Sequence, residues 1–381
     1  MKRRLAIITE IISPYRIPLF NVLSRRPEVD LHVIFLAETD PGLRDWKVYK
    51  QEIAFSNEVL PSWRKRIAGY NFLLNSGVSK ALTAANPDVV LCGGYNYLAS
   101  WLAQRWARAR SVPFFLWSES NLQDKRSSNF AKESLKDRFL RSCHGFVVPG
   151  KSAEQYLRTK GIEEKSIFTA VNAVDNEFFT SSADSVRQHA PQVRAEFHLP
   201  SRYFLFVGRL VEEKGIFELL NAYTALEDNI REKIGLVYVG DGPARQALER
   251  QAAKISPGVI TFVGFQQREQ LTNFYALSEM LILPTHSDTW GLVVNEGMAC
   301  GLPVVLSKVA GCAADLVTHD WNGFLVGVKD AESLVSAMRN LATNSSLQEL
   351  MSARSKERIA AYSPENWAEG IVRMLDAVET A

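Results

Sequence analysis

The chain has 381 residues, of which 46% are hydrophobic and 23% are charged, and its formal net charge is +2. This is the composition of a folded globular protein, and the length exceeds what one hydrophobic core usually serves, so we expect two domains. No stretch approaches the ~20 apolar residues that a membrane-spanning helix needs. The four cysteines have neither metal-ligand spacing nor the pattern of a disulfide framework, so we expect a cytoplasmic protein with reduced thiols.

The charge is unevenly distributed along the chain. Residues 1–180 contain 26 Lys and Arg against 18 Asp and Glu, whereas the remainder contains 18 against 24. A basic first half can lie against an anionic membrane surface or bind an anionic acceptor. Its basic segments include residues 63–66 (WRKR) and 101–110 (WLAQRWARAR). Two interpretations of the second segment stay open: a helix that packs on the core with solvated arginines, and peripheral contact with the inner face of a membrane.

The first half alternates short apolar runs with helical patterns. Strands are predicted at residues 5–9, 31–36, 89–92, 114–117 and 145–148, and helices at residues 14–23, 72–85, 96–109 and 130–143. Ser13 and Pro14 form a good helix opening, with Ser as the N-cap and Pro at the first helical position. Together these elements predict an N-terminal α/β domain over residues 1–180.

Polar and aromatic residues follow three of the predicted strands, at the edge of a parallel sheet where ligands bind. Tyr15 and Arg16 follow the first strand, Tyr95 follows the third and Glu119 follows the fourth. We expect these four residues to line a binding site. For Tyr15 and Arg16 a second interpretation stays open, in which they belong to the opening turn of the helix.

The second half alternates more regularly. A polar stretch at residues 181–200 predicts a linker between the domains. After it, strands are predicted at residues 203–207, 236–239, 259–262, 280–284, 303–306 and 324–326, with helices between them. This alternation predicts a second doubly wound α/β domain over residues 201–363. A final helical pattern covers residues 364–378.

The most informative segment runs from Asp288 to Glu296 (DTWGLVVNE), between an apolar strand and a new helix. The unpaired N–H groups of a helix's first turn favour an anion such as a diphosphate. Gly291 lets backbone approach a ligand closely. Glu296 lies one turn beyond Leu292, so it can accept hydrogen bonds from a sugar or ribose diol. The alternative is that Asp288 only caps the helix and Glu296 is a solvated charge.

A second motif, residues 207–215 (VGRLVEEKG), follows another strand and precedes its helix. It places Arg209 and Lys214 at the same edge of the predicted sheet as the first motif. Arginine suits forked recognition of phosphate, and lysine supplies a mobile point charge. Two cations, a helix N-terminus and two carboxylates at one edge indicate a nucleotide-sugar site.

The two motifs together resemble those of the retaining glycosyltransferases of family 4, the glycosyl transferases group 1. The family signature is a pair of glutamates separated by seven residues, followed by small residues and a Gly-Leu-Pro-Val-Val-type strand. Glu296 matches the second glutamate and residues 301–305 (GLPVV) match the strand, whereas Asp288 stands in place of the first glutamate. Arg209 and Lys214 match the family's basic pair.

The resemblance implies two facing Rossmann-like doubly wound domains, the GT-B architecture, with residues 364–381 returning to the N-terminal domain. It implies transfer of a sugar, as in a hexosyltransferase, from a UDP- or GDP-linked donor to a glycan or lipid-linked acceptor in polysaccharide biosynthesis. Arg209, Lys214, Asp288 and Glu296 are then the catalytic residues, and the acceptor side is formed by Tyr15, Arg16, Tyr95 and Glu119. The donor-binding residues would include Gly208, Gly240, Gly242, Thr289, Trp290, Gly291, Leu292 and Glu296.

No cofactor and no metal are expected, because the chain has no Asp-x-Asp pair that could anchor a divalent cation. Nucleic acid is not an expected partner. Two alternatives remain: another nucleotide-sugar enzyme such as an epimerase, and a non-catalytic nucleotide-binding protein of the same fold. A dinucleotide-dependent oxidoreductase is disfavoured, because the segments around Gly208 and Gly240 do not complete the G-x-G-x-x-G fingerprint.

Overall fold

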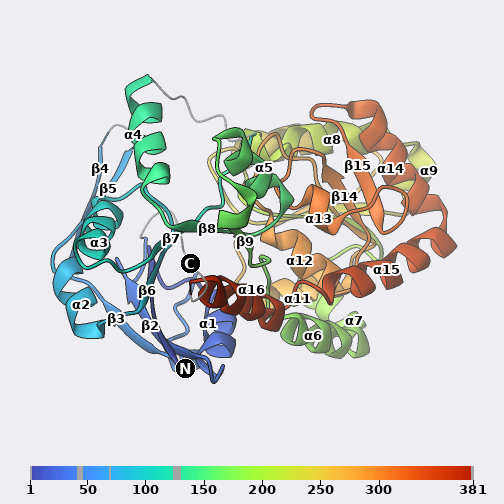
Figure 1. Ribbon diagram of the computed structural model, residues 1–381. Helices are drawn as coiled ribbons and strands as arrows, with labels where there is room; N and C mark the ends of the chain where they lie inside the picture. The colour runs from blue at the N-terminus through green and yellow to red at the C-terminus, as the bar shows by residue number, and fades with distance from the viewer. Residues whose placement is uncertain (1, 41–45, 68–69, 123–129, 379–381) are drawn as a thin grey trace. The chain divides into compact units, whose positions relative to one another are not determined.

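The computed structural model describes residues 2–40, 46–67, 70–122 and 130–378. The chain divides into two compact units (Figure 1). The first unit comprises Met1–Val174 together with Pro364–Ala381, and the second is Asp175–Ser363. The stretch 181–200, where we expect a linker, lies within the second unit and is largely helical.

The first unit is built on a seven-stranded sheet in the order β3-β2-β1-β6-β7-β8-β9. All neighbouring strands are parallel. The strands are β1 (Arg3–Thr9), β2 (Val29–Phe35), β3 (Ser56–Val59), β6 (Val89–Cys92), β7 (Phe114–Trp117), β8 (Gly145–Val148) and β9 (Ile167–Thr169). The helices are α1 (Ile17–Ser24), α2 (Val78–Ala85), α3 (Leu98–Ala109), α4 (Phe130–Arg141), α5 (Lys151–Thr159) and α16 (Pro364–Ala377).

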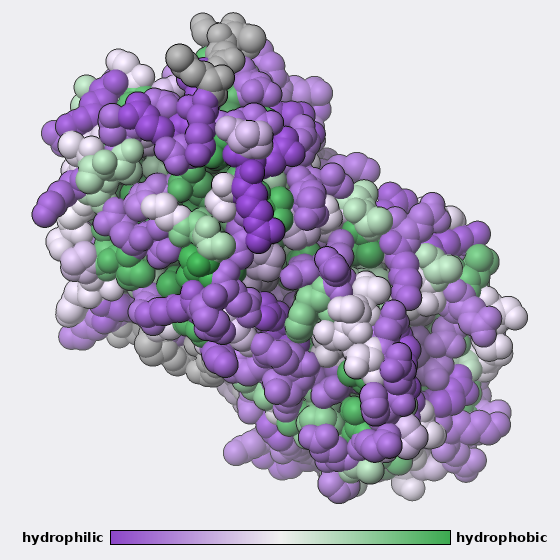
Figure 2. All heavy atoms as spheres, turned by 90° about the horizontal axis from the view of Figure 1, so that it is seen from below, coloured by the Kyte–Doolittle hydropathy of each residue, from purple (hydrophilic) through white to green (hydrophobic). Residues whose placement is uncertain are grey.

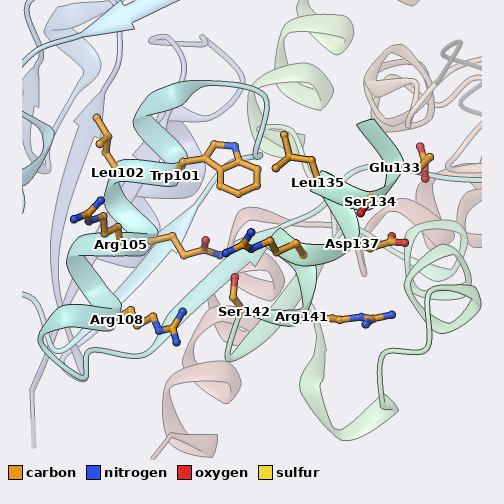
Figure 3. A pocket seen from close by; sticks show the side chains of 12 residues that line it. Trp101, Leu102, Arg105, Arg108, Glu133, Ser134, Leu135, Asp137, Arg141 and Ser142 are labelled. Carbon is orange, nitrogen blue, oxygen red and sulfur yellow. The ribbon is translucent and has the colours of Figure 1, made fainter. Parts of the chain in front are cut away.

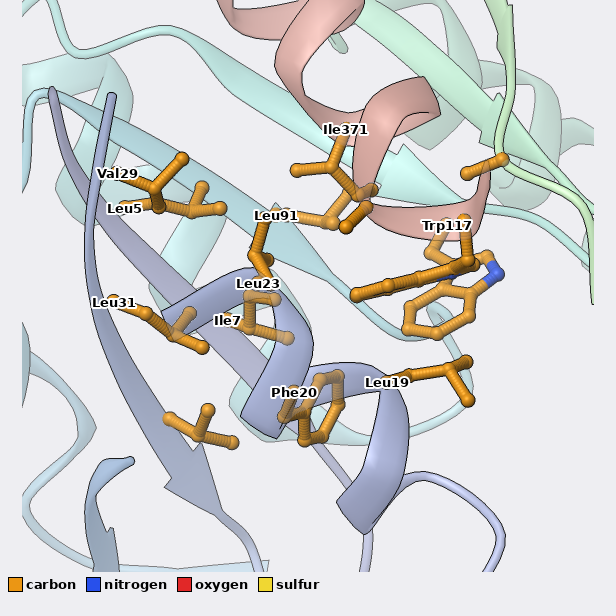
Figure 4. Packing of buried hydrophobic residues seen from close by; sticks show 14 of the residues in the cluster. Leu5, Ile7, Leu19, Phe20, Leu23, Val29, Leu31, Leu91, Trp117 and Ile371 are labelled. Atoms are coloured by element: carbon orange, nitrogen blue, oxygen red, sulfur yellow. The ribbon is translucent and has the colours of Figure 1, made fainter. Parts of the chain in front are cut away.

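Helices cover both faces of this sheet, because successive side chains of a strand point to opposite faces. Leu5 and Ile7 of β1 enter one buried cluster, which they share with α1 and α16 (Figure 4). Ala6 and Ile8 enter the other cluster, with α2, α3, α4 and α5. The near-continuous apolar runs of the strands follow from this burial on both sides.

Helix α16 contributes to the core of the first unit although it comes from the end of the chain. Trp367 is fully buried, and its ring lies 5.4 Å from that of Trp117 and 5.7 Å from that of Phe20. Residues 1–174 therefore form their core together with the last helix.

Two local predictions in the first unit are wrong. Residues 72–85 do not form one helix: Tyr70–Asn75 is a strand, β5, that pairs antiparallel with β4 (Ser62–Ile67), and α2 follows. The strand has a period of two, with Leu73 buried and its neighbours Phe72 and Leu74 exposed. Gly77 then takes the left-handed conformation that separates β5 from α2.

The start of α1 also differs from the prediction. Ser13 accepts a hydrogen bond from Arg16 N (2.9 Å) in a turn, and the helix begins at Ile17. Pro18, rather than Pro14, is the proline of the first helical turn.

The second unit is built on a six-stranded parallel sheet in the order β12-β11-β10-β13-β14-β15. The strands are β10 (Tyr203–Val207), β11 (Gly235–Val239), β12 (Ile260–Gly264), β13 (Met280–Leu283), β14 (Val304–Ser307) and β15 (Gly323–Val326). The helices are α6 (Asn176–Gln188), α7 (Ala190–Glu196), α8 (Ile216–Thr224), α9 (Asp228–Arg231), α10 (Arg245–Ala252), α11 (Arg268–Leu277), α12 (Leu292–Ala299), α13 (Ala313–Leu316), α14 (Ala331–Thr343) and α15 (Ser345–Ile359). The predicted α/β class with parallel, doubly wound sheets is confirmed.

The surface is mainly polar. Hydrophilic residues cover most of the face seen in Figure 2, with hydrophobic residues in separate smaller patches. Within the described ranges, no helix is both long enough and apolar enough to cross a bilayer.

Candidate functional site

The loops after β10 and β11 are held together by backbone contacts at the carboxyl edge of the second sheet. Gly208 N donates to Val239 O (3.0 Å), and Leu210 N donates to Asp241 O (2.9 Å). A Cβ atom on Gly240 would lie 1.9 Å from Gly208 O, so this position accepts no side chain. The three glycines predicted to contact the donor (Gly208, Gly240 and Gly242) therefore lie where these two loops meet.

The loop after β13 is joined to the loop after β10 on its other side. His286 N donates to Glu213 O (2.8 Å), and the hydroxyl of Thr285 donates to the same carbonyl (3.1 Å). A Cβ atom on Gly215 would lie 2.1 Å from Pro284 O, and the positive φ of this glycine (+69°) turns the chain into α8. Three adjacent loops thus form one continuous edge.

Lys214 and Asp288, which the sequence places on two different loops, are in direct contact. Lys214 Nζ lies 2.6 Å from Asp288 Oδ2, and both side chains are partly exposed. The second carboxylate oxygen of Asp288 accepts from Trp290 N (3.2 Å). Asp288 therefore both pairs with the lysine and fixes the turn that leads into α12.

Helix α12 begins with an open N-terminus. Gly291 is its N-cap in the left-handed conformation (φ +97°), and as a glycine it has no side chain with which to cap the first turn. Trp290 is buried, and its Nε1 donates to Asn295 Oδ1 (2.9 Å), so Trp290 anchors the loop through its side chain. The N–H groups at Leu292 and the following residue thus start a helix without a side-chain partner, and such groups attract anions.

Glu296 lies on α12 and contacts a residue that we did not predict. Tyr275 of α11 donates from its hydroxyl to Glu296 Oε2 (2.7 Å). Burial raises the pKa of Glu296 to about 7, and the hydrogen bond from Tyr275 opposes that rise. The carboxyl group is therefore poised to change its protonation near neutral pH.

Arg209 is exposed at the same edge. It forms no ion pair with another residue among those that the structure describes, in contrast to Lys214. Its loop position next to Gly208 leaves the guanidinium able to reach a ligand without breaking a protein contact.

The first unit also has polar side chains at the carboxyl edge of its sheet. Arg16 lies 2.9 Å from Glu119, and its guanidinium stacks 4.1 Å from the ring of Trp117 at the end of β7. Tyr15 packs edge-on against Trp46 at 5.8 Å. Arg16 and Glu119 are thus brought together although they are far apart in the sequence.

Tyr95 makes different contacts. Its carbonyl accepts from Trp101 Nε1 (3.1 Å), and its ring packs 5.9 Å from that of Phe139 on α4. These contacts join Tyr95 to α3 and α4, and within the described part of the chain Tyr95 forms no hydrogen bond with Arg16 or Glu119.

Two contacts at these sheet edges were not predicted from the sequence. Tyr275 precedes Glu296 by 21 positions on another helix, a spacing that carries no signal of its own. Arg64 of β4 reaches the nearly buried Asp40 (2.7 Å) and also Glu10 (3.2 Å). This cluster could be predicted only if the β4–β5 hairpin was known, and the sequence pattern had predicted a helix over residues 72–85 instead.

Among the residues that the structure describes, no three His, Cys, Asp or Glu side chains gather as a metal site would require. The expectation that the protein uses no metal stays a prediction.

Comparison with known proteins gives the site its context. Residues 192–358 match the model of the family described as glycosyl transferases group 1. A sulfoquinovosyl transferase of Arabidopsis thaliana is 33% identical over 230 residues, covering 59% of this chain and 43% of the relative. A 2-deoxystreptamine N-acetyl-D-glucosaminyltransferase of Niallia circulans is 24% identical over 274 residues, covering 69% and 68% of the two chains.

The solved structure of the Anabaena HepE protein, in complex with UDP and glucose, is similar with a TM-score of 0.74 and 16% identity. The similarity covers 98% of this chain and 99% of that one. This chain spans about half of the length, or less, of many curated relatives that it matches. The fold is therefore that of the GT-B glycosyltransferases, with two Rossmann-like α/β domains, and residues 192–358 carry the group 1 pattern.

Proposed function

We propose that the protein is a retaining glycosyltransferase. It moves a hexosyl group from a UDP- or GDP-linked sugar to a glycan or lipid-linked acceptor, and it needs no metal ion. The observation that carries this proposal is the contact between Lys214 and Asp288 beside the open N-terminus of α12. This contact lies inside the segment that matches the glycosyl transferases group 1.

The second unit would bind the donor through its diphosphate. Cleavage of the sugar–phosphate bond leaves negative charge on the diphosphate, and preorganised donors at that charge supply the main stabilisation. Arg209 is exposed, and the N–H groups at Leu292 and Val293 begin α12. The loops after β10 and β11 meet at Gly208, Gly240 and Gly242. Because these glycines have no side chains, the phosphates could approach the backbone closely there.

Lys214 can serve two ligands at once. An ammonium group has three donors, and in this structure one is directed at Asp288 Oδ2 (2.6 Å) and another at Ser287 O (3.5 Å). The third donor can reach a phosphate while Asp288 stays paired. Asp288 would then hold a hydroxyl of the donor sugar, and Thr289 would lie beside that sugar.

Glu296 would hold the ribose of the nucleotide. Tyr275 occupies Oε2, so Oε1 is the oxygen left to accept from the ribose diol. This division explains why one carboxylate can be fixed by the protein and still bind ligand. The same geometry favours the ionised form for binding, because a carboxylate accepts from both partners.

Retention would follow from reaction on one face of the sugar. The bond from the anomeric carbon to the departing phosphate oxygen breaks while the acceptor oxygen bonds to the same face. The acceptor proton passes to the departing phosphate oxygen, so atoms and charge balance without an enzymic base. Lys214 and Arg209 would stabilise that oxygen.

The first unit would bind the acceptor, as its basic charge and polar sheet edge favour. Arg16 and Glu119 offer a cation and an anion 2.9 Å apart on an aromatic platform, an arrangement suited to sugar hydroxyls or a phosphate. Tyr15 lies next to Arg16 and would border the same site. Tyr95, in the loop between β6 and α3, would border the acceptor with its ring.

The proposal is tested by incubating the protein with UDP-, GDP- and ADP-sugars and a panel of glycan and lipid-linked acceptors, with and without a chelator. We expect nucleotide release with one donor, acceptor dependence and no chelator effect. Proton NMR of the product should give the anomeric configuration of the donor. Inversion would refute retention, loss with chelator would refute metal independence, and an epimerised donor formed without acceptor would favour an epimerase.

A further inference from the structure

A basic groove lies between α3 and α4 of the first unit, apart from the polar sheet edge described above. Its volume is about 860 Å³. At its base the two helices pack through the rings of Trp101 and Phe139, 4.7 Å apart, and Gln104 donates to Phe139 O (3.2 Å). Trp101 and Leu135 face each other across it (Figure 3). These contacts hold α3 and α4 together at the base of the groove.

Four arginines line the groove, two from each helix. They are Arg105, Arg108, Arg138 and Arg141. All four are exposed, and none forms an ion pair with a residue in the described part of the chain. Their charges are thus available to an external anion.

The acidic side chains of the groove do not neutralise these arginines. Glu133 lies 2.7 Å from Lys160 Nζ, and Asp137 lies 3.1 Å from the same atom. Lys160, the residue that follows α5, thus engages both carboxylates. The groove consequently presents an excess of positive charge.

Apolar side chains surround the same arginines. Leu98 and Leu102 of α3 and Leu135 of α4 are exposed, Leu98 and Leu135 by more than half of their surface. An exposed leucine alone needs no explanation, but three beside four unpaired arginines form an amphipathic surface.

The β4–β5 hairpin adds a second apolar face next to α3. Leu73 of β5 shares a buried cluster with Ala99 of α3, so its strand neighbours point outward. Trp63 is paired with Leu74 across the hairpin, and both are about half exposed. Lys65 lies on the same outward face of the hairpin as Trp63 and Leu74. The side chain of residue 66 is outside the described part of the chain.

The placement of the arginines and the apolar side chains favours one class of anionic ligand over another. In Figure 3, Arg105 extends away from α4 and Arg141 extends away from α3, so these two guanidinium groups point in opposite directions along the surface. A small phosphate would need cations that converge on one point. Spread cations with exposed apolar side chains instead match a surface that carries many phosphates above hydrocarbon, which is an anionic bilayer.

We propose that the described side chains of α3, α4, β4 and β5 form a membrane-contact surface, with the four arginines on phospholipid headgroups and the leucines in the acyl boundary. This surface does not depend on the proposed transferase activity. It would hold the protein at the membrane, where a lipid-linked substrate resides.

The test is co-sedimentation of the full chain with vesicles. Wild-type protein should bind vesicles of phosphatidylglycerol and phosphatidylcholine in about a 1:2 ratio, bind phosphatidylcholine vesicles poorly, and detach as salt rises. Replacing the four arginines by glutamine should weaken binding by up to ~600-fold, since each of the four cations near the surface contributes about a fivefold factor. Replacing Leu98, Leu102 and Leu135 by serine should weaken it too.

A matched control removes four exposed cations of the second unit. Lys233, Arg250, Lys254 and Lys329 changed to glutamine give the same change in net charge and should leave vesicle binding within about twofold. Equal loss in both quadruple variants would overturn the proposal. So would wild-type protein that ignores the lipid charge, or pyrophosphate that displaces the vesicles at constant ionic strength.

Discussion

The carboxyl edges of the two parallel sheets differ in the contacts that hold their loops together. In the second unit, backbone meets backbone: a Cβ atom on Gly240 or on Gly311 would lie 1.9 Å from the carbonyl oxygen of Gly208 or Thr289. Such contacts are possible only for glycine, and beside them Arg209 is exposed whereas Lys214 pairs with Asp288.

In the first unit, side chains meet side chains. Arg16 pairs with Glu119, and Arg64 pairs with Asp40. These ion pairs are partly or largely buried, so their charges are already balanced within the protein. A ligand at this edge would have to compete with them or bind around them.

The difference indicates a division of labour under the proposed function. A backbone-built edge fits the diphosphate, which is common to all nucleotide-sugar donors. A side-chain-built edge can differ from protein to protein and can select one acceptor. The predictions below test whether ligand binding follows this division.

The largest effect is expected from Lys214→Ala. Removal of one preorganised donor at a developing negative charge typically costs ~10²–10³-fold in rate, so transfer should fall by that factor. Lys254→Ala, an exposed lysine of the same unit, should retain wild-type rates. Steady-state kinetics with the donor found in the screen measures both, and equal activity of the two variants would refute the site.

Gly240→Ala tests the backbone-built edge. The new Cβ atom would meet Gly208 O at 1.9 Å, so we expect a loss of more than about 3 kcal/mol in the free energy of unfolding. The matched control is Gly94→Ala in the first unit, where φ is also positive but no atom lies within 4 Å; there we expect about 1 kcal/mol. Chemical denaturation compares them, and equal losses would mean that the close approach is unimportant.

Arg16→Ala tests the side-chain-built edge. Loss of a charge-assisted contact should raise the acceptor KM roughly 10- to 100-fold, and nucleotide affinity should not change. Arg16→Lys should recover part of the loss, since it keeps the charge but not the planar stack on Trp117. A variant that binds nucleotide poorly would place Arg16 in the donor site.

A smaller effect is expected from the protonation of Glu296. Its pKa of about 7 exceeds the unfolded value of about 4.3. Between these values the folded chain holds an extra proton, so its stability falls as pH rises through this window. Between pH ~5 and ~8, wild type should lose of order 2 kcal/mol more than Glu296→Gln. Parallel curves for the two proteins would contradict the raised pKa.

The sequence predicted the second unit better than the first, because the two sheet edges are held together by different kinds of contact. Backbone-built edges need glycines at fixed places, and positions such as Gly208, Gly240 and Gly291 mark them in the chain. All six strands of that sheet were predicted, with boundaries off by one or two residues. The contact of Lys214 with Asp288 agrees with the prediction that the two motifs share one edge.

The remaining features depend on contacts that no local pattern encodes. The β4–β5 hairpin was missed because the apolar residues before α2 also fit a helical period, and the pairing partner lies outside that window. Tyr275 reaches Glu296 from another helix, and Arg64 reaches Asp40 from the hairpin. Each of these contacts joins two elements, so it appears only once the fold is known.

The most direct test of the donor site is calorimetric titration of UDP, or GDP if UDP gives no heat, into wild type, Lys214→Ala and Arg16→Ala. We expect binding to wild type without added metal, at least ~10-fold weaker binding to Lys214→Ala and unchanged binding to Arg16→Ala. Unchanged affinity in Lys214→Ala together with lost affinity in Arg16→Ala would contradict the assignment of the donor to the second unit.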